Sequence, residues 1–367
     1  MKIIDIQAIP IRIPLKNAFT IAVGTLTHTN HVLVRMTDDE GHVGWGETTT
    51  FHVVYGYDQH MLAHVLREYL IPAVMGLDPH DLALMHKRMD EAIPKNLMAK
   101  TGVDLAAHDL IAQAAGVPLV DMIGGRRMDR IPQIGLVGIS PPEEAALSAM
   151  EQINEGYRTI KIKVGGNAGE DLRRIEAVRE AVGGGIGIRV DGNCGYDRDT
   201  ALRTFVRAEE YGLEWIEQPL PAWDLEGMAA LARRLDTPIA VDESMYTLQD
   251  AQHCIALGAA DVVNIKIPKC GGIFRSRKIA AACEAAGVPC FLGGCIETTP
   301  GTAAAMHFYA ATPNMVSATE IFGSMYYEDD VTAAPLTVEN GSIALTHEPG
   351  LGVRVDVGKV EKYRADV

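Results

Sequence analysis

The sequence has no long apolar run, since no stretch approaches the roughly 18 apolar residues that suggest a membrane-spanning helix. Residues 1–9 alternate as in a β-strand and lack the apolar region and the cleavage site of a signal peptide. The six cysteines form no C-x-x-C pair, in a chain too large to need disulfides to support its core. We therefore expect a reduced, cytoplasmic protein with no membrane partner.

Positive charge is also scarce, because 33 lysines and arginines face 48 acidic residues and leave a net charge of −15. This balance disfavours a nucleic-acid partner. The glycine run at 183–185 lacks the G-x-G-x-x-G order of a nucleotide-binding loop, and no G-x-S-x-G nucleophile motif occurs. His60 and His64 have the spacing of zinc ligands, but no glutamate stands beside His60 and no third ligand is evident. Both histidines are therefore predicted to lie on a helix surface.

What the chain does contain is a set of five short β-branched runs, each ending in a lysine or a carboxylate. The end residues are separated by 28, 26, 25 and 24 positions, and they are Lys163, Asp191, Glu217, Asp242 and Lys266. Each step is about the length of one βα unit. Near-continuous apolar runs are typical of parallel strands covered by helices on both faces. The five charged side chains should therefore share the rim where (β/α)₈ barrels of the α/β class have their active sites.

The chain of 367 residues is long enough for a barrel of ~250 residues and a smaller domain. Strand and helix patterns predict an α+β capping domain at 1–125, the barrel at 126–325, and a C-terminal segment at 326–367 that returns to the first domain. Two loops of the first domain, at about 14–30 and 48–58, are longer than their connections need. Long ordered loops are often lids, so we expect these two loops to contact the substrate.

The three central acids, Asp191, Glu217 and Asp242, would repel one another in adjacent positions unless a cation lay among them. We interpret them as ligands of one hard divalent ion. The alternative for each acid is a helix cap, since acids at βα junctions often cap the next helix. Glu243 follows Asp242 directly, and strand alternation favours Asp242 as the residue that points inward.

Lys161 and Lys163 lie two residues apart and so project to one face of their strand, while Lys266 stands opposite on the ring. Lys269 is predicted to be an ordinary loop lysine. These lysines could merely pair with the acids, because buried ion pairs also occur without catalysis.

A divalent ion and lysines would also stabilise the charge that develops when a proton leaves the carbon next to a carboxylate. A lysine beside a metal ion and a second lysine has a lowered pKa, so it can act as a base as well as an acid. The pattern therefore predicts proton transfer alpha to a carboxylate.

The motifs at these residues resemble the enolase superfamily in its muconate-lactonising branch, and the resemblance covers nearly the whole chain. It rests on Lys161-x-Lys163, Asp191-x-Asn193, Glu217-Gln-Pro, Asp242-Glu243-Ser and Lys266-Ile-x-Lys-x-Gly-Gly. The resemblance implies a (β/α)₇β TIM-type barrel and a capping domain that the C-terminal segment completes. It also implies one Mg²⁺ or Mn²⁺ per subunit, a small carboxylate substrate and a homo-oligomer, either an octamer or a dimer.

The same resemblance implies roles for individual residues. The three central acids would bind the metal ion, Lys163 and Lys266 would be the acid/base pair, and Lys161 would lower the pKa of Lys163. Asn193 and Glu243 would support the metal site. Further side chains expected to bind substrate are Glu297 and Glu320 at the ends of strands seven and eight, and Ile21, His52, Tyr55 and Tyr57 in the two loops.

Activities in this branch include cycloisomerisation, epimerisation, racemisation and dehydration. The segments Thr319-Glu-Ile-Phe-Gly and Tyr55-Gly-Tyr resemble those of muconate cycloisomerases, and the Asp-x-Asp with which dipeptide epimerases hold an ammonium is absent. We therefore expect first a muconate-type cycloisomerase. The alternatives are a racemase or epimerase of dipeptides or N-acyl amino acids, and an o-succinylbenzoate synthase-like dehydratase. Outside this chemistry, a Schiff-base aldolase or a non-catalytic binding protein stays open.

Overall fold

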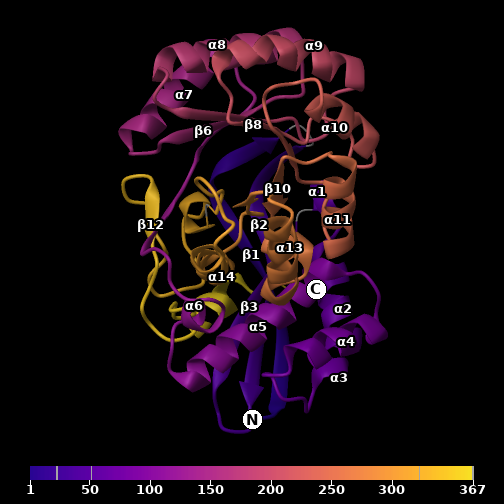
Figure 1. Ribbon diagram of the computed structural model, residues 1–367. Coiled ribbons are helices and arrows are strands. Elements are labelled where there is room, and N and C mark those ends of the chain that lie inside the picture. Colours follow the sequence, from indigo (N-terminus) through magenta and orange to yellow (C-terminus); the bar gives the residue numbers. More distant parts are fainter. Residues whose placement is uncertain (22–23, 51, 322, 366–367) are drawn as a thin grey trace.

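The computed structural model describes residues 1–21, 24–50, 52–321 and 323–365. Two sheets organise the chain, one antiparallel with three strands and one parallel with seven (Figure 1). The first sheet belongs to the capping domain and the second to the barrel. No helix in the described ranges is long and apolar enough to cross a membrane.

The capping sheet is an antiparallel meander of β1 (Ile3–Ile21), β2 (Gly24–Asp38) and β3 (Val43–Thr49). Among the described residues the prediction of a loop at 14–30 was wrong, because β1 pairs with β2 at Pro14 with His28 and again from Phe19 to Ile21, with a register shift between Pro14 and Phe19. Pairing the two arms satisfies their backbone hydrogen bonds, which an open loop would leave to water. The side chain of Ile21 lies outside what the structure describes.

The helices of the capping domain are α1 (His52–Tyr55), α2 (Gln59–Val65), a π-helical turn (Leu66–Leu70), α3 (Ile71–Val74), α4 (Leu82–Ala92), α5 (Leu97–Ala115) and α6 (Leu119–Met122). The longest is α5, which ends before Gly116 in the left-handed conformation. It lies so close to β3 that a Cβ on Gly46 would stand 2.1 Å from the backbone oxygen of Gly102. Because glycine has no side chain, Gly46 permits this close approach of α5 to the sheet.

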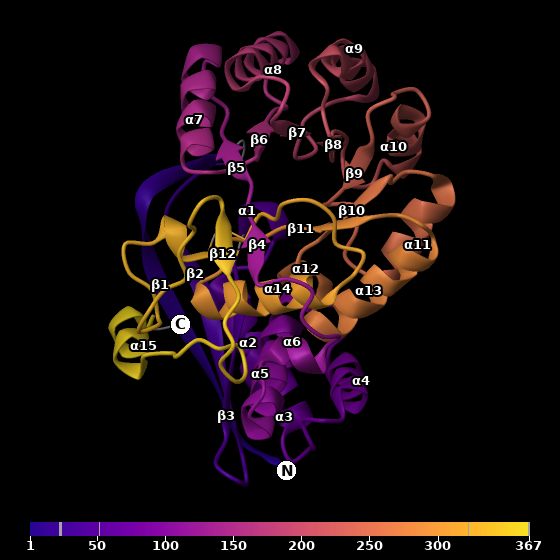
Figure 2. The ribbon, with the colours of Figure 1, turned by 60° about the vertical axis from the view of Figure 1, so that its left-hand side comes forward.

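The parallel sheet has its strands in sequence order, which is the order of consecutive βα units. They are β5 (Gly135–Val137), β6 (Thr159–Lys163), β7 (Gly187–Asp191), β8 (Trp215–Glu217), β9 (Ile239–Val241), β10 (Val262–Ile265) and β11 (Cys290–Leu292). The helices between them are α7 (Pro142–Asn154), α8 (Ala168–Val182), α9 (Arg198–Ala208), α10 (Leu225–Ala232), α11 (Leu248–Leu257), α12 (Ile267–Cys270) and α13 (Ile273–Ala285). Figure 2 shows these helices along the outside of the curled sheet.

Side chains alternate along each barrel strand. Those that point outward, such as Ile160, Ile162 and Val190, are fully buried under the helices. Among those that point inward, Trp215 and Phe291 belong to a small cluster of their own, and the Arg189 guanidinium lies 3.8 Å from the Trp215 ring centroid. These large side chains fill one end of the barrel, so the inward polar residues farther along the strands stand at the other end.

Residues 315–320, predicted as strand eight, join the two edges of the parallel sheet. Their backbone pairs at single bridges, of Met315 with Cys290 and of Thr319 with Gln133. Thr319 also accepts a hydrogen bond of 2.9 Å from the backbone N–H of Ile134. Isolated bridges of this segment therefore close the ring. Along the chain, α14 (Thr299–Ala311) comes between β11 and this segment.

The C-terminal segment touches both domains. Its strand β12 (Ser342–Ala344) pairs with β4 (Arg130–Pro132), just before the barrel begins. Its last helix, α15 (Val357–Tyr363), lies beside β1, and Arg364 bridges to Ile11. Figure 2 shows this segment in yellow next to the capping strands.

Candidate active site

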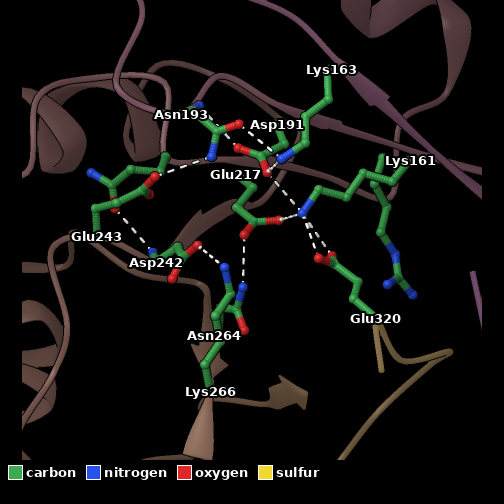
Figure 3. Close-up of polar contacts among 12 residues, drawn as sticks. Lys161, Lys163, Asp191, Asn193, Glu217, Asp242, Glu243, Asn264, Lys266 and Glu320 are labelled. Atoms are coloured by element: carbon green, nitrogen blue, oxygen red, sulfur yellow. Dashed lines mark hydrogen bonds and ion pairs between the residues drawn. The ribbon is translucent and has the colours of Figure 1, made fainter. Parts of the chain in front are cut away.

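The charged residues predicted from the strand ends lie abreast at one end of the barrel. Lys163, Asp191 and Glu217 are Cα partners in register across β6, β7 and β8. Asp242 follows β9 directly and Lys266 follows β10. The order around the ring is therefore lysine, three acids, lysine, and Figure 3 shows Glu217 between Lys161 and Lys266.

Lys161 is buried and bound by carboxylates on three sides. Its Nζ lies 2.8 Å from both Asp191 Oδ2 and Glu217 Oε2, and 2.7 Å from Glu320 Oε1. Burial alone would lower the pKa of Lys161, but the carboxylates, Asp191 first, raise it well above its ordinary value. Lys161 is therefore a fixed positive charge.

Lys163 lies above Lys161 on the same face of β6. It donates to Asp191 Oδ2 at 2.6 Å and to Asn193 Oδ1 at 2.8 Å. Its side chain is 18% exposed, against 1% for Lys161. Of the two β6 lysines, Lys163 is therefore the one that can reach a bound substrate.

Lys266 stands across the ring with Lys269 beside it. Both donate to Asp242 at 2.6 Å, Lys266 to Oδ2 and Lys269 to Oδ1. The Lys266 Nζ also lies 3.2 Å from the hydroxyl of Tyr55, which reaches over from the capping domain. The prediction that Lys269 is an ordinary loop lysine was wrong, because the single turn of α12 brings its side chain back over Asp242 and buries it completely.

Two glutamates in the site hold their protons tightly. Burial, followed by repulsion from Asp191, raises the pKa of Glu217 to about 8. Burial and the neighbouring Asp242 raise the pKa of Glu243 to about 7. One oxygen of Glu243 accepts from Asn193 at 3.1 Å, while its other oxygen is buried and has no hydrogen-bond partner among the described residues. The site thus carries more carboxylate than its lysines neutralise.

The charge of the whole cluster fits a divalent cation. It comprises the carboxylates of Asp191, Glu217, Asp242, Glu243 and Glu320 and the ammonium groups of Lys161, Lys163, Lys266 and Lys269. With all nine groups ionised the net charge is −1, and a carboxylate substrate would make it −2, which one divalent ion would cancel. Carboxylate oxygens are also the donors that Mg²⁺ prefers.

The described residues contain no group of three acidic, histidine or cysteine side chains already arranged as a metal site. The lysines account for this, since those of β6 draw Asp191 to one side while Lys266 and Lys269 draw Asp242 to the other. A cation held by both aspartates would therefore have to replace some of these ion pairs.

The remaining residues expected to contact substrate fall in different places. Glu320 binds Lys161, and Glu297 is buried with one oxygen accepting from the backbone N–H of Cys295 at 2.9 Å. Burial raises the pKa of Glu297 to about 7. Tyr57 packs against the core of the capping domain. His52 is exposed and lines a surface hollow beside α15, so the structure does not bring it to the lysines.

Sequence reasoning missed two polar residues of the site. Asn264 donates to Glu217 Oε1 at 2.7 Å, and the side-chain oxygen of Gln218 accepts from the backbone N–H of Asp242 at 3.0 Å. Asn264 precedes Lys266 by two residues, so strand alternation alone would have placed it on the same face. Gln218 turns away from β8 with a φ of 34°, which no local pattern indicates.

Two family descriptions match most of the chain. Residues 3–124 match "Mandelate racemase / muconate lactonizing enzyme, N-terminal domain", and residues 144–359 match "Enolase C-terminal domain-like". The chain belongs to this family of the enolase superfamily. The resemblance drawn from the motifs and the α/β fold class are thereby confirmed.

Three curated relatives are similar over nearly their whole length. N-succinyl-L-Arg/Lys racemase of Bacillus cereus is 35% identical over 97% of this chain and 96% of its own. L-Ala-D/L-Glu epimerase of Bacillus subtilis is 35% identical over 96% of this chain and 97% of its own. Muconate cycloisomerase 1 of Rhodococcus opacus is 30% identical over 99% of this chain and 98% of its own. These relatives are isomerases, and the racemase and the epimerase are more similar to this chain than the cycloisomerase is.

Solved structures give the same ranking by sequence identity but not by superposition, since the 2-chloromuconate cycloisomerase from Rhodococcus opacus superposes with a TM-score of 0.96 at 30% identity, covering 100% of both chains. N-succinyl Arg/Lys racemase from Bacillus cereus superposes with a TM-score of 0.96 at 34% identity, covering 100% of this chain and 99% of that one. Dipeptide epimerase from Enterococcus faecalis, complexed with Mg and the dipeptide L-Leu-L-Tyr, has a TM-score of 0.92 at 33% identity, covering 96% and 100%. The comparisons therefore favour the racemase or epimerase alternative over the cycloisomerase that we expected first.

Proposed function

We propose that this enzyme interconverts the two configurations at the alpha carbon of an N-acylated amino acid or a dipeptide. The observation that carries the proposal is the position of Lys163 and Lys266, on β6 and after β10, with three acid-bearing strands between them. Inverting a carbon requires removal of a proton from one face and delivery to the other. Two lysines on opposite sides of one substrate site suit that requirement.

The two lysines would exchange roles with the direction of the reaction. The one acting as base must begin neutral and the one acting as acid must begin charged. Lys163 stands beside the fixed ammonium of Lys161 on the same face of β6, and its Nζ contacts Asp191 and Asn193. In the opposite direction Lys266 would be the base, with the Tyr55 hydroxyl near its Nζ.

We further propose that Asp191, Glu217 and Asp242 hold one Mg²⁺ ion, with Glu243 and Asn193 beside them. When bound, the ion would supply fixed positive charge where the substrate carboxylate gains a second negative charge as the alpha proton leaves. The raised pKa of Glu217 supports a cation in this place, as does the buried oxygen of Glu243 that finds no hydrogen-bond partner in the described part of the chain. The Mg in the structure of the Enterococcus faecalis relative also supports it.

The test is hydrogen exchange in D₂O with purified enzyme, Mg²⁺ and a panel of N-succinyl amino acids and dipeptides, each offered separately as its two alpha configurations. We expect deuterium at the alpha carbon of both configurations of at least one compound, and none after EDTA treatment. Lys163→Ala and Lys266→Ala should each abolish exchange from one configuration and leave exchange from the other.

The same preparation is offered cis,cis-muconate, and loss of diene absorbance is followed. Exchange without diene loss supports the racemase or epimerase. Diene loss without exchange on any compound of the panel would contradict it and return the assignment to a cycloisomerase.

A further inference from the structure

The turn that carries Lys266 and Lys269 is held at its beginning by the capping domain. Lys266 occupies the N-cap position of α12, a helix of only four residues, and Lys269 lies within it. The Thr101 hydroxyl, on α5, has one proton to donate and lies 3.2 Å from the backbone oxygen of Ile267, 3.0 Å from that of Pro268 and 3.1 Å from that of Leu97 in its own helix. The two acceptors outside α5 are buried, and they belong to the two residues that follow the acid/base lysine.

The same capping helix holds the other end of this turn. Asp104, also on α5, accepts hydrogen bonds from the first backbone N–H groups of α13, at 2.5 Å from Ile273 and 3.3 Å from Phe274. The N-cap position of α13 is Gly272, which has no side chain to do this, so a carboxylate from the other domain caps the helix. A Cβ on Gly272 would lie 2.2 Å from the Asp104 carboxyl carbon. The start of α13 and the Asp104 side chain of α5 are therefore in close contact.

Asp104 is itself fixed from behind by two histidines. His86, on α4, lies with its Nε2 2.8 Å from Asp104 Oδ2, and His108, one turn farther along α5, lies with its Nδ1 3.3 Å from Oδ1. All three side chains are buried. The carboxylate therefore has little freedom to follow α13 if that helix shifts, and it acts as a fixed anchor.

We infer that Asp104 and Thr101 are positioning residues for Lys266, so that the capping domain sets where this acid/base group stands. The inference rests on the proposed function, in which Lys266 and Lys163 serve opposite faces of the alpha carbon. Lys163 lies on β6, which Asp104 and Thr101 do not contact through any described hydrogen bond. Disturbing the anchor should therefore impair one direction of proton transfer and spare the other.

The experiment uses the full-length enzyme with Mg²⁺ and a substrate for which both configurations exchange in D₂O. Lys163→Ala and Lys266→Ala first identify which configuration depends on which lysine. Asp104→Asn should then slow the exchange that depends on Lys266 by about 10- to 100-fold, because displacing a reacting group by about 1 Å costs that much. Exchange that depends on Lys163 should stay within about twofold, since β6 is held independently of the turn.

Asp109→Asn is the matched control. Asp109 lies on the same helix, is equally buried, and also accepts two backbone N–H groups, from Trp45 at 2.7 Å and Leu351 at 2.8 Å. It should alter both exchange rates alike, whatever it does to stability. Thr101→Val, which removes one hydroxyl, is the second test and covers the case in which Asp104→Asn does not fold.

The inference is overturned if Asp104→Asn or Thr101→Val slows both exchanges equally, or if Asp109→Asn shows the same one-sided loss. If wild-type enzyme exchanges no compound, the proposed function fails, and the anchor is tested by reductive methylation with peptide mass spectrometry. An intact inference then requires methylation of Lys266, relative to Lys163, to rise at least about threefold in Asp104→Asn because the turn opens more often. An unchanged ratio would overturn the anchor as well.

Discussion

Lys266 and Lys269 bind the two oxygens of one carboxylate, that of Asp242, at the same distance of 2.6 Å. Lys269 is completely buried and also donates to the Asp242 backbone oxygen at 2.7 Å. The two ammonium groups therefore neutralise the Asp242 carboxylate. Lys269 does so from a fully buried position, while Lys266 is the more exposed of the two lysines.

Lys269→Met should lower stability by about 3 kcal/mol, because it leaves a buried carboxylate with half of its compensating charge. Proton exchange by Lys266 should fall as well, since Lys266 would then be the only ammonium on Asp242. Urea unfolding and the D₂O assay measure the two effects. Lys278→Met, at an exposed position on α13, is the control and should change stability by less than about 0.5 kcal/mol. Equal behaviour of the two variants would contradict a structural charge at Lys269.

Glu217→Gln should weaken Mn²⁺ binding by at least about 100-fold, because a neutral amide replaces a charged ligand at the centre of the three acids. Calorimetric titration with Mn²⁺ measures this without any substrate. Glu214→Gln removes a carboxylate three residues earlier, where it pairs with Arg189, and should leave Mn²⁺ affinity unchanged. Retained Mn²⁺ binding in Glu217→Gln would count against the metal assignment.

His307 should make the stability of the protein depend on pH. It is buried on α14, where its Nδ1 accepts from the backbone N–H of Val120 and its Nε2 contacts the backbone oxygen of Leu351. Burial lowers its pKa from 6.5 to about 4. The unfolded chain therefore binds a proton between these values that the folded chain does not, so stability is complete above about pH 6.5 and is lost as pH falls toward 4, by about 3 kcal/mol.

This pH dependence is measured by urea unfolding from pH 7.5 to 4.5 in the wild type and in His307→Gln, which cannot titrate. The stability difference between the two should shrink as the pH falls. His60→Gln, at an exposed position, should track the wild type at every pH. A constant difference between wild type and His307→Gln would show that His307 does not titrate in this range.

Gly46→Ala should destabilise the capping domain by about 2–4 kcal/mol, since the new methyl group would overlap the backbone of α5 at Gly102 and force the helix off the sheet. Gly185→Ala is the matched control, because a Cβ there would meet no atom within 4 Å. The measurement is the thermal unfolding midpoint of each variant, compared with that of the wild type. Similar midpoints would mean that α5 does not rest on β3 as closely as described.

The sequence by itself determined the residues at the barrel strand ends and their order around the ring. It could do so because strand alternation and the length of a βα unit are local properties, the first found in five strands and the second in the four steps between Lys163 and Lys266. The same alternation would also have found Asn264. The helix of 97–115 was predictable as well, since its apolar run and the glycine that ends it are features of neighbouring residues in the sequence.

Only the tertiary structure decided which partner each charge takes. Lys161 binds Glu320, which lies 159 residues away, and Asp104 caps a helix of the other domain, 169 residues away. Pro14 pairs with His28 and Ile21 with Gly24, where the sequence had predicted an open loop. These outcomes depend on where distant segments are brought together, and burial then fixes the charge of each group. Neither the meeting of the segments nor the burial is a property of adjacent residues.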